Sequence, residues 1–272
     1  MKLLLENWRQ FLDQTTGMSN AQISTLILEI FKERFKKYLQ DKPLLSNFIN
    51  VLDKEGIKWG VTGGGVRDLL LNLPLNDVDI VADCTDKELE KIIEDNNIEV
   101  GKINRFGGRK LRLDPHTELV DVWTVGTTWG VKKGYVKNTG LGAYPEATTY
   151  STDAVIVSPS SDEIYADHLI DSIKSQKINI VFGKTPIAIS TLEKMYRLVK
   201  KYGLQPGEDA LKFADLIKQK QLSSSDKQDF EVLQEDKELD LSKEEAEEIL
   251  SVFSLIADTP SLNEGRLYET ST

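Results

Sequence analysis

Apolar side chains recur at helical spacing through the first 55 residues of the chain. Leu4, Trp8 and Phe11 fall on one helical face, and a second apolar series follows at similar spacing. That series consists of Ile23, Leu26, Ile27, Ile30, Phe31, Phe35 and Tyr38. The segment 17–20 begins with a glycine and separates the two series. The pattern predicts N-terminal helices over residues 1–55, interrupted near residues 17–20.

Between residues 56 and 183, short apolar runs alternate with helical periodicity. The runs predict strands at 57–62, 77–81, 98–102 and 151–158, and a hairpin of 110–113 with 118–125. The periodic segments predict helices at 65–72, 86–96 and 168–175. Helices follow at 186–202, 207–221, 226–237 and 242–257. We therefore expect an α+β head over residues 56–183, a helical region over 184–258 and a tail over 259–272.

The formal net charge of −10 is distributed unevenly along the chain. Residues 221–272 contain 14 Asp or Glu and 4 Lys or Arg, which accounts for the whole imbalance. Residues 101–140 instead contain eight Lys or Arg and three Asp or Glu. Such a basic segment fits a triphosphate or a polynucleotide, and it equally fits a solvated hairpin. The acidic C-terminal helices are candidates for binding a protein partner.

The composition favours a cytoplasmic protein. No apolar run approaches the roughly 18 residues that a membrane-spanning helix needs, so no contact with a membrane is expected. The segment after Met1 lacks the apolar core of a signal peptide. Cys84 is the one cysteine, which excludes an intramolecular disulfide framework and fits a reducing compartment.

The most informative segment joins a glycine-rich turn to a pair of carboxylates. The sequence GGGVRD at 63–68 follows an apolar strand and opens a short helix, and Asp77 and Asp79 lie on the next strand. Residues i and i+2 of a strand point to the same side, so the two carboxylates would project together. Two like charges so close are costly unless a cation neutralises them. The alternative is a turn kept only for packing, followed by solvated aspartates.

Over these residues the chain resembles the nucleotidyltransferases of the DNA polymerase β type. More narrowly, it resembles the head domain of bacterial poly(A) polymerases and class II CCA-adding enzymes. The family motif GGxVRDxLLGxxPxDxD corresponds to residues 63–79, with Asn72 where the family usually has glycine. The resemblance covers roughly residues 57–203. It implies a polymerase β-like palm domain with a mixed sheet, a nucleoside triphosphate as substrate, and Mg²⁺ or Mn²⁺ as cofactor.

The resemblance gives the acidic residues a catalytic role. In nucleotidyl transfer a hydroxyl attacks the α-phosphate of a triphosphate, and carboxylates bridge the cations that stabilise the reacting oxygens. Asp77 and Asp79 fit this bridging role. Asp121 is the candidate third metal ligand, because an acid inside an apolar strand demands a partner. The alternative for Asp121 is a solvent-facing position at a strand end, since Leu119 and Trp123 share its side of the strand.

Three residues of the glycine-rich turn are candidate nucleotide ligands. Gly63 and Gly64 would let backbone N–H groups approach phosphate oxygens at a helix N-terminus, whose dipole favours anions. Arg67 is expected either to fix its helix against the sheet or to reach the nucleotide.

Three more candidates lie further along the chain. Arg109 belongs to the basic hairpin and is a candidate to steer the triphosphate. Lys194 and Arg197 share a helical face in a segment that resembles the helix joining head to neck, with Lys194 where arginine is usual. They would either contact the triphosphate or form an exposed helix surface. Residues 149–154 resemble a diverged RRDFTINA segment without its arginines, and Asp153 stands in place of asparagine, which weakens the prediction of family-type ribose and base recognition.

The preferred hypothesis is a metal-dependent nucleotidyltransferase that transfers a nucleoside monophosphate to a hydroxyl, most plausibly on RNA such as a tRNA 3′ end. The acidic C-terminal region argues against complete CCA addition, because it would repel a phosphate backbone. Two alternatives stay open. One is a toxin- or resistance-type nucleotidyltransferase that modifies a protein or a small molecule. The other is a catalytically inactive nucleotide-binding or scaffolding module.

Overall fold

The computed structural model describes residues 2–75, 78–104, 107–113, 120–184 and 188–220. Several sequence predictions lie outside the described residues. These are Asp77, the turn between the two hairpin strands, the helices at 226–237 and 242–257, and the tail.

Three helices form the N-terminal region, whereas the apolar spacing predicts helices with a single interruption near residues 17–20. They are α1 (Lys2–Thr15), α2 (Asn20–Leu39) and α3 (Pro43–Lys54), and the expected interruption falls between α1 and α2. Ser19 and Gln22 form a reciprocal capping box that begins α2 by satisfying free backbone N–H groups. The buried face of α2 repeats every four residues and consists of Ile23, Ile27, Phe31 and Phe35. This apolar stripe packs α2 into the main core.

A seven-stranded sheet forms the centre of the molecule, in the order β3-β4-β5-β2-β1-β6-β7. Its strands are β1 (Trp59–Thr62), β2 (Asp79–Ala82), β3 (Val100–Ile103), β4 (Arg109–Leu111), β5 (Val120–Thr124), β6 (Ile156–Ser158) and β7 (Glu163–Tyr165). The pair β2–β5 is parallel, whereas every other pair in this sheet is antiparallel. The predicted α+β class with a mixed sheet is therefore confirmed.

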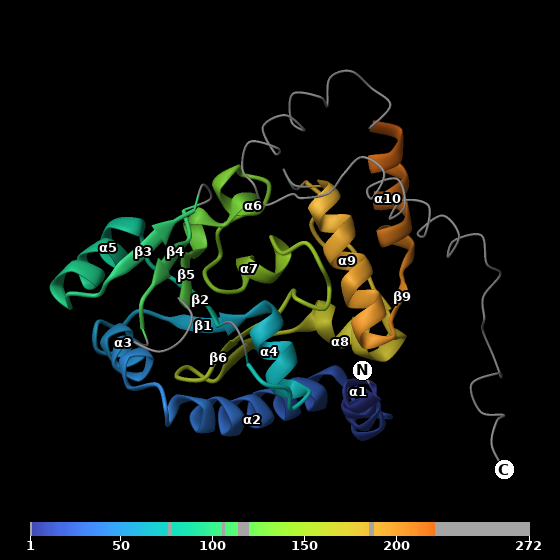
Figure 1. Cartoon of the computed structure of the whole chain (residues 1–272), viewed down its shortest axis with the longest axis horizontal. Coiled ribbons are helices and arrows are strands. Elements are labelled where there is room, and N and C mark those ends of the chain that lie inside the picture. Colours follow the sequence, from blue (N-terminus) through green and yellow to red (C-terminus); the bar gives the residue numbers. More distant parts are fainter. Residues whose placement is uncertain (1, 76–77, 105–106, 114–119, 185–187, 221–272) are drawn as a thin grey trace, which may run out of the picture.

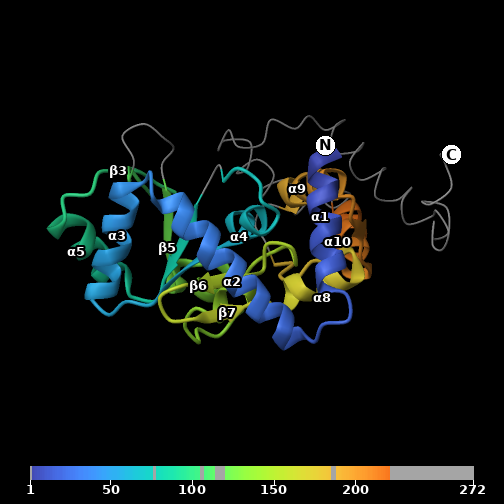
Figure 2. The same cartoon turned by 90° about the horizontal axis from the view of Figure 1, so that it is seen from below.

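The two faces of the sheet are covered differently. Val61, Ile80 and Val122 point into the main core, which also takes in α2, α3 and α5 (Asp86–Asp95). Val81 and Ile156 point to the opposite face and form a smaller apolar cluster with residues of α7 (Ala143–Glu146). Figure 1 shows α2 and α3 below the sheet, with α6 (Trp129–Lys132) and α7 above it. Seen from below in Figure 2, α2 crosses the sheet diagonally.

The remaining elements complete the molecule around this sheet. They are α4 (Gly63–Leu70), the 3-10 turn η1 (Val125–Thr127), α8 (Asp167–Ser175), α9 (Ala188–Tyr202), α10 (Glu208–Lys220), and the short strands β8 (Lys177–Ile178) and β9 (Gln205–Pro206). In Figure 1, α9 and α10 stand beside the sheet. Trp8 of α1 contacts Tyr202 of α9 with ring centroids 6.1 Å apart. Among the described helices, none has the length and apolar character required to cross a bilayer.

The strand predicted over residues 151–158 is wrong in its first half. Only Ile156–Ser158 forms a strand, and residues 151–153 form a turn. The polar side chains of this turn bind partners elsewhere in the fold. The Ser151 hydroxyl accepts hydrogen bonds from the backbone N–H of Asn179, at 2.8 Å, and from the Ser172 hydroxyl, at 2.6 Å. Buried polar groups need such hydrogen-bond partners, and the turn lets the Ser151 hydroxyl reach them.

Candidate active site

Asp79 and Asp121 lie side by side on the parallel strands β2 and β5. They are register partners, and the next partners along the strands are Ile80 and Val122. Neighbouring strands are about 4.8 Å apart, and side chains of register partners leave the sheet on the same face. Ile80 and Val122 alternate to the opposite face and are fully buried in the main core. The apolar alternation thus fixes both carboxylates on the face that carries α7.

The two carboxylate oxygens of Asp121 differ in their contacts. Its Oδ2 lies 3.2 Å from Nζ of Lys110, the register partner of Asp121 on β4. Its Oδ1 is buried and makes no hydrogen bond within the described part of the chain. A buried carboxylate oxygen without a partner is costly, and a cation would relieve that cost.

The glycine-rich turn lies directly beside Asp79. Thr62, the last residue of β1, is the register partner of Asp79, and α4 begins at the next residue, Gly63. Gly63 has a φ of +64°, and a Cβ placed on it would lie 3.9 Å from Oδ2 of Asp79. The Gly63 N–H donates to the carbonyl of Val155 at 3.3 Å. This amide is thus engaged within the protein, while the half-buried Gly64 follows it in the first turn of the helix.

Tyr144 of α7 lies near Asp79, on the face of the sheet that α7 covers. Burial raises the pKa of its phenol, and the charge of Asp79 raises it further. The hydroxyl therefore remains protonated, and Thr62 and Thr148 are its side-chain hydrogen-bond partners. Sequence analysis missed this residue, because no element is predicted between residues 126 and 150. Its only signal is an aromatic residue within a segment rich in glycine.

Arg67 is buried at the centre of an ion-pair network between α4, α9 and the turn at residues 151–153. Its Nη1 pairs with Oδ1 of Asp153, and its Nε lies 3.3 Å from Oδ1 of Asp68. Its guanidinium lies over the ring of Tyr202, with Cζ 4.7 Å from the centroid. Through these contacts Arg67 joins α4 to its neighbours in the fold, and its guanidinium points at other protein side chains.

The charges of this network stabilise one another. Burial alone would lower the pKa of Arg67, and it is the largest single influence, but Asp153, Tyr202 and Asp68 together outweigh it and the pKa is raised. Burial alone would raise the pKa of Asp153, but Arg67 and then Lys194 hold it below its ordinary value. The Tyr202 hydroxyl donates to Oδ1 of Asp68 at 2.7 Å and closes the network from α9. Both buried groups are therefore charged.

Lys194 joins this network from α9. Its Nζ lies 3.1 Å from Oδ2 of Asp153 and 5.1 Å from the ring centroid of Tyr150. Its side chain is 49% exposed, so it reaches the buried pair from the surface. Arg197 follows one turn later on α9 and is exposed. The structure thus brings Lys194 together with Arg67, as neighbours of the same carboxylate.

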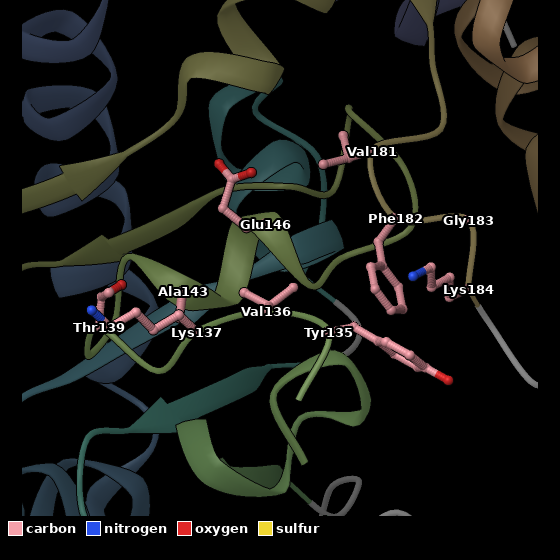
Figure 3. Close-up of a pocket in the computed structure, with 10 residues that line it drawn as sticks. All are labelled: Tyr135, Val136, Lys137, Thr139, Ala143, Glu146, Val181, Phe182, Gly183 and Lys184. Carbon is pink, nitrogen blue, oxygen red and sulfur yellow. The ribbon is translucent and has the colours of Figure 1, made fainter. Parts of the chain in front are cut away.

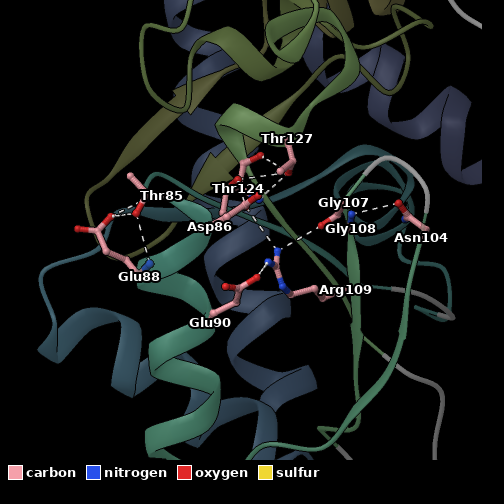
Figure 4. Close-up of polar contacts among 10 residues, drawn as sticks. All are labelled: Thr85, Asp86, Glu88, Glu90, Asn104, Gly107, Gly108, Arg109, Thr124 and Thr127. Carbon is pink, nitrogen blue, oxygen red and sulfur yellow. Dashed lines mark hydrogen bonds and ion pairs between the residues drawn. The ribbon is translucent and has the colours of Figure 1, made fainter.

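Arg109 lies on the other face of the sheet. Its register partner is Val122, which alternates with Asp121, so its side chain points away from the aspartates. Figure 4 shows its guanidinium directed at α5, where Nη2 lies 2.6 Å from Oε1 of Glu90 and Nη1 3.5 Å from Oδ1 of Asp86. Arg109 is buried by these contacts. The structure does not bring it together with the other predicted site residues.

The described residues fit a divalent cation in part. Asp79 and Asp121 supply carboxylate oxygens, the donors that Mg²⁺ and Mn²⁺ prefer, and Oδ1 of Asp121 is buried without a hydrogen-bond partner in the described residues. Within those residues no group of three or more His, Cys, Asp or Glu side chains could hold a metal ion. Asp77, the third predicted ligand, lies outside them.

Comparison with known proteins identifies the fold. Residues 60–144 match the family model described as the poly A polymerase head domain, which confirms the predicted resemblance over that segment. An apo structure of a CCA-adding enzyme superposes with a TM-score of 0.55 at 16% identity, over 84% of this chain and 53% of that one. No curated protein sequence matches the chain.

Two ligand-bound structures share the fold. A CCA-adding enzyme in complex with CTP has a TM-score of 0.53 at 16% identity, over 84% of this chain and 53% of that one. A tRNA nucleotidyltransferase complexed with a primer tRNA and an incoming ATP analog has a TM-score of 0.50 at 15% identity, over 76% of this chain and 60% of that one. This chain therefore spans between half and three fifths of the length of these enzymes.

Proposed function

We propose that this chain, whose residues 60–144 match the poly A polymerase head domain, is a metal-dependent nucleotidyltransferase. It would transfer a nucleoside monophosphate from a triphosphate to a hydroxyl on RNA. The observation that carries the proposal is the in-register pair Asp79 and Asp121, beside a glycine-started helix, with one carboxylate oxygen buried and without a hydrogen-bond partner in the described residues.

Each residue at the site has a part in this chemistry. Asp79 and Asp121, with Asp77, would hold Mg²⁺ or Mn²⁺, which stabilises the charge that develops on the attacking and leaving oxygens. The first turn of α4, with Gly64, offers backbone N–H groups to a phosphate beside the carboxylates. Tyr144 would place its protonated, buried hydroxyl beside Asp79.

Binding of the triphosphate also involves the network behind the glycine-rich turn. Arg67 holds α4 against α9 and Asp153, which fixes the direction of the helix N-terminus. Lys194 and Arg197 lie at the surface of α9, where their charges would attract the polyphosphate chain. Arg109 takes no part in this proposal, because it points to the opposite face.

The acceptor is proposed from the structural neighbours. Two of them are described as complexes with CTP and with a primer tRNA and an ATP analog. We infer an RNA hydroxyl as the acceptor class for this chain. Because the chain spans only part of their length, the proposal does not extend to the complete addition of a CCA end.

Incorporation of label from each α-³²P-labelled triphosphate into total RNA tests the proposal. Wild-type protein with Mg²⁺ or Mn²⁺ should label RNA, and chelation of the metal should stop it. Asp79→Asn and Asp121→Asn should each lower the rate at least about a hundredfold, because each removes a charge that holds the cation. Asp83→Asn is the matched control, since this exposed carboxylate directly follows β2 and should leave the rate unchanged.

The same assay separates the alternatives. If the label is found in protein or in a small molecule, the acceptor is not RNA and the chain is a toxin- or resistance-type nucleotidyltransferase. Triphosphate binding without incorporation into any fraction would identify an inactive nucleotide-binding module. Full activity of folded Asp79→Asn protein would overturn the assigned chemistry.

A further inference from the structure

A pocket of about 560 Å³ opens on the outer side of α7. Tyr144 of α7 lies next to Asp79, whereas its neighbours Ala143 and Glu146 line the pocket. None of the predicted catalytic or nucleotide-binding residues lines it. Figure 3 shows Phe182, Lys184 and Tyr135 grouped at one end, Lys137 and Thr139 at the other, and α7 between them. The pocket is therefore separate from the carboxylate site but only one short helix away.

The walls of the pocket are held in place by packing and hydrogen bonds. The Trp129 indole N–H donates to the carbonyl of Lys184 at 2.9 Å, which ties the segment 181–184 to α6. Gly130 packs so closely that a Cβ on it would meet Ala147 at 3.0 Å and the ring of Phe182 at 3.2 Å. These contacts fix the ring of Phe182 and the backbone that carries Lys184.

The lining combines an accessible aromatic surface with positive charge. Tyr135 is 52% exposed and contacts Phe182, with ring centroids 6.2 Å apart and planes tilted by 42°. Nζ of Lys184 lies 4.5 Å from the Tyr135 ring centroid. The lining contains two lysines, Lys137 and Lys184, and one acidic residue, Glu146. Aromatic surfaces beside lysines are what proteins use to bind single-stranded nucleic acid.

We propose that this pocket binds one nucleotide of a single-stranded RNA. The base packs on the exposed ring of Tyr135, which contacts the buried ring of Phe182, and the phosphates on its two sides pair with Lys184 and Lys137. The lysines lie at opposite ends of the pocket, which suits a strand with a phosphate before and after each base (Figure 3). Glu146, which also lies 3.0 Å from Nε2 of His168, can accept a hydrogen bond from a 2′-hydroxyl or a base amino group.

The inference deepens the proposed function, and rests on it in one respect. A strand held here, next to the carboxylate site, would be the acceptor of the transferred nucleotide. Binding itself requires neither triphosphate nor metal, so it can be measured apart from catalysis.

Fluorescence anisotropy of a short labelled oligouridylate with the full-length protein, without metal or triphosphate, tests the proposal. Tyr135→Ala should weaken binding about tenfold, because one base loses its stacking surface. Lys184→Gln should reduce the slope of log affinity against log salt by about 0.7, because one phosphate contact is lost. Lys36→Gln removes an equal charge from α2, on the far side of the sheet, and should change neither quantity.

Each outcome decides the question. Absence of binding by the wild-type protein at low salt, or wild-type affinity in both pocket variants, overturns the proposal. Competition by free uridine monophosphate at the same concentration as the oligonucleotide would identify a site for a mononucleotide. That result would overturn the proposal that the pocket binds single-stranded RNA. Loss of RNA affinity in the pocket variants alone supports it. Failure of the proposed function appears separately, as RNA binding by wild-type protein that incorporates no label.

Discussion

Asp79 and Asp121 occupy matched positions on two parallel strands, and Lys110 pairs with the second of them from the next strand. The lysine lies 3.2 Å from Oδ2 of Asp121, so it offsets part of the negative charge of the carboxylate pair. A cation that binds between the aspartates would meet the charge of this lysine as well. The lysine therefore acts against the cation while the carboxylates attract it.

Replacement of Lys110 by methionine should tighten the binding of Mn²⁺ to the site. Removal of a nearby positive charge at a half-exposed position favours a second cation by about 1 kcal/mol, or about fivefold in affinity. Titration calorimetry measures the Mn²⁺ affinity of the wild type and the variant. Arg112→Met is the control, because Arg112 pairs with Glu99 at the exposed edge of the sheet and should leave the affinity unchanged. Weaker Mn²⁺ binding by Lys110→Met would show that the lysine supports the site.

Substitution of Gly63 by alanine should affect both stability and activity. Its φ of +64° costs a residue with a Cβ about 1–2 kcal/mol, and the added methyl would lie 3.9 Å from Oδ2 of Asp79. Gly56, with a φ of +70° and open space around it, provides the comparison. Urea unfolding should show a similar loss for both alanine variants, whereas nucleotide incorporation should fall only for Gly63→Ala. Equal activity in the two variants would separate the glycine-rich turn from the chemistry.

The sequence predicts the site where a local rule applies. Alternation along a strand predicts that the side chains of Asp121 and Val122 point to opposite faces of the sheet. The structure has that arrangement, with Val122 in the main core. The glycine at position 63 predicts a tight turn into a helix, and its positive φ explains the choice of residue. Both predictions depend on geometry within a few residues.

Other features depend on contacts between distant segments, which no local pattern contains. Arg109 lies on a basic hairpin, but its register with Val122 turns it toward Glu90 instead of the aspartates. The strand predicted at 151–158 is shortened because Ser151 and Asp153 find partners 21 or more residues away. Both features arise because tertiary packing decides which distant groups become ion-pair or hydrogen-bond partners.

Replacement of Asp153 by asparagine should destabilise the protein by about 3–5 kcal/mol at pH 7, because it leaves the buried Arg67 without its main counter-charge. The pKa of Asp153 is held below its ordinary 3.8, so its stabilising effect is present above about pH 4 and is lost as the pH falls further. The gap between wild type and variant in urea unfolding should therefore narrow at acidic pH.

The matched comparison for Asp153→Asn is Asp162→Asn. Asp162 pairs with Lys32 at the surface, where both side chains are largely exposed. An exposed pair contributes about 0–1 kcal/mol, so this variant should stay close to the wild type at every pH. Equal losses in the two variants would mean that the Arg67 network is no more important to the fold than a surface pair.

The thiol of Cys84 should react slowly in the folded protein. Burial, and after it the charge of Glu88, raises its pKa to about 11 from an ordinary 9.0. The thiolate is the reactive form, so at pH 8 its fraction is about a hundredfold lower than in an exposed cysteine. Alkylation by iodoacetamide, followed by mass spectrometry, should therefore accelerate about tenfold per pH unit above pH 8. In urea the thiol should recover the rate of glutathione. A native rate equal to that of glutathione would contradict the partial burial of Cys84 beside the acidic first turn of α5.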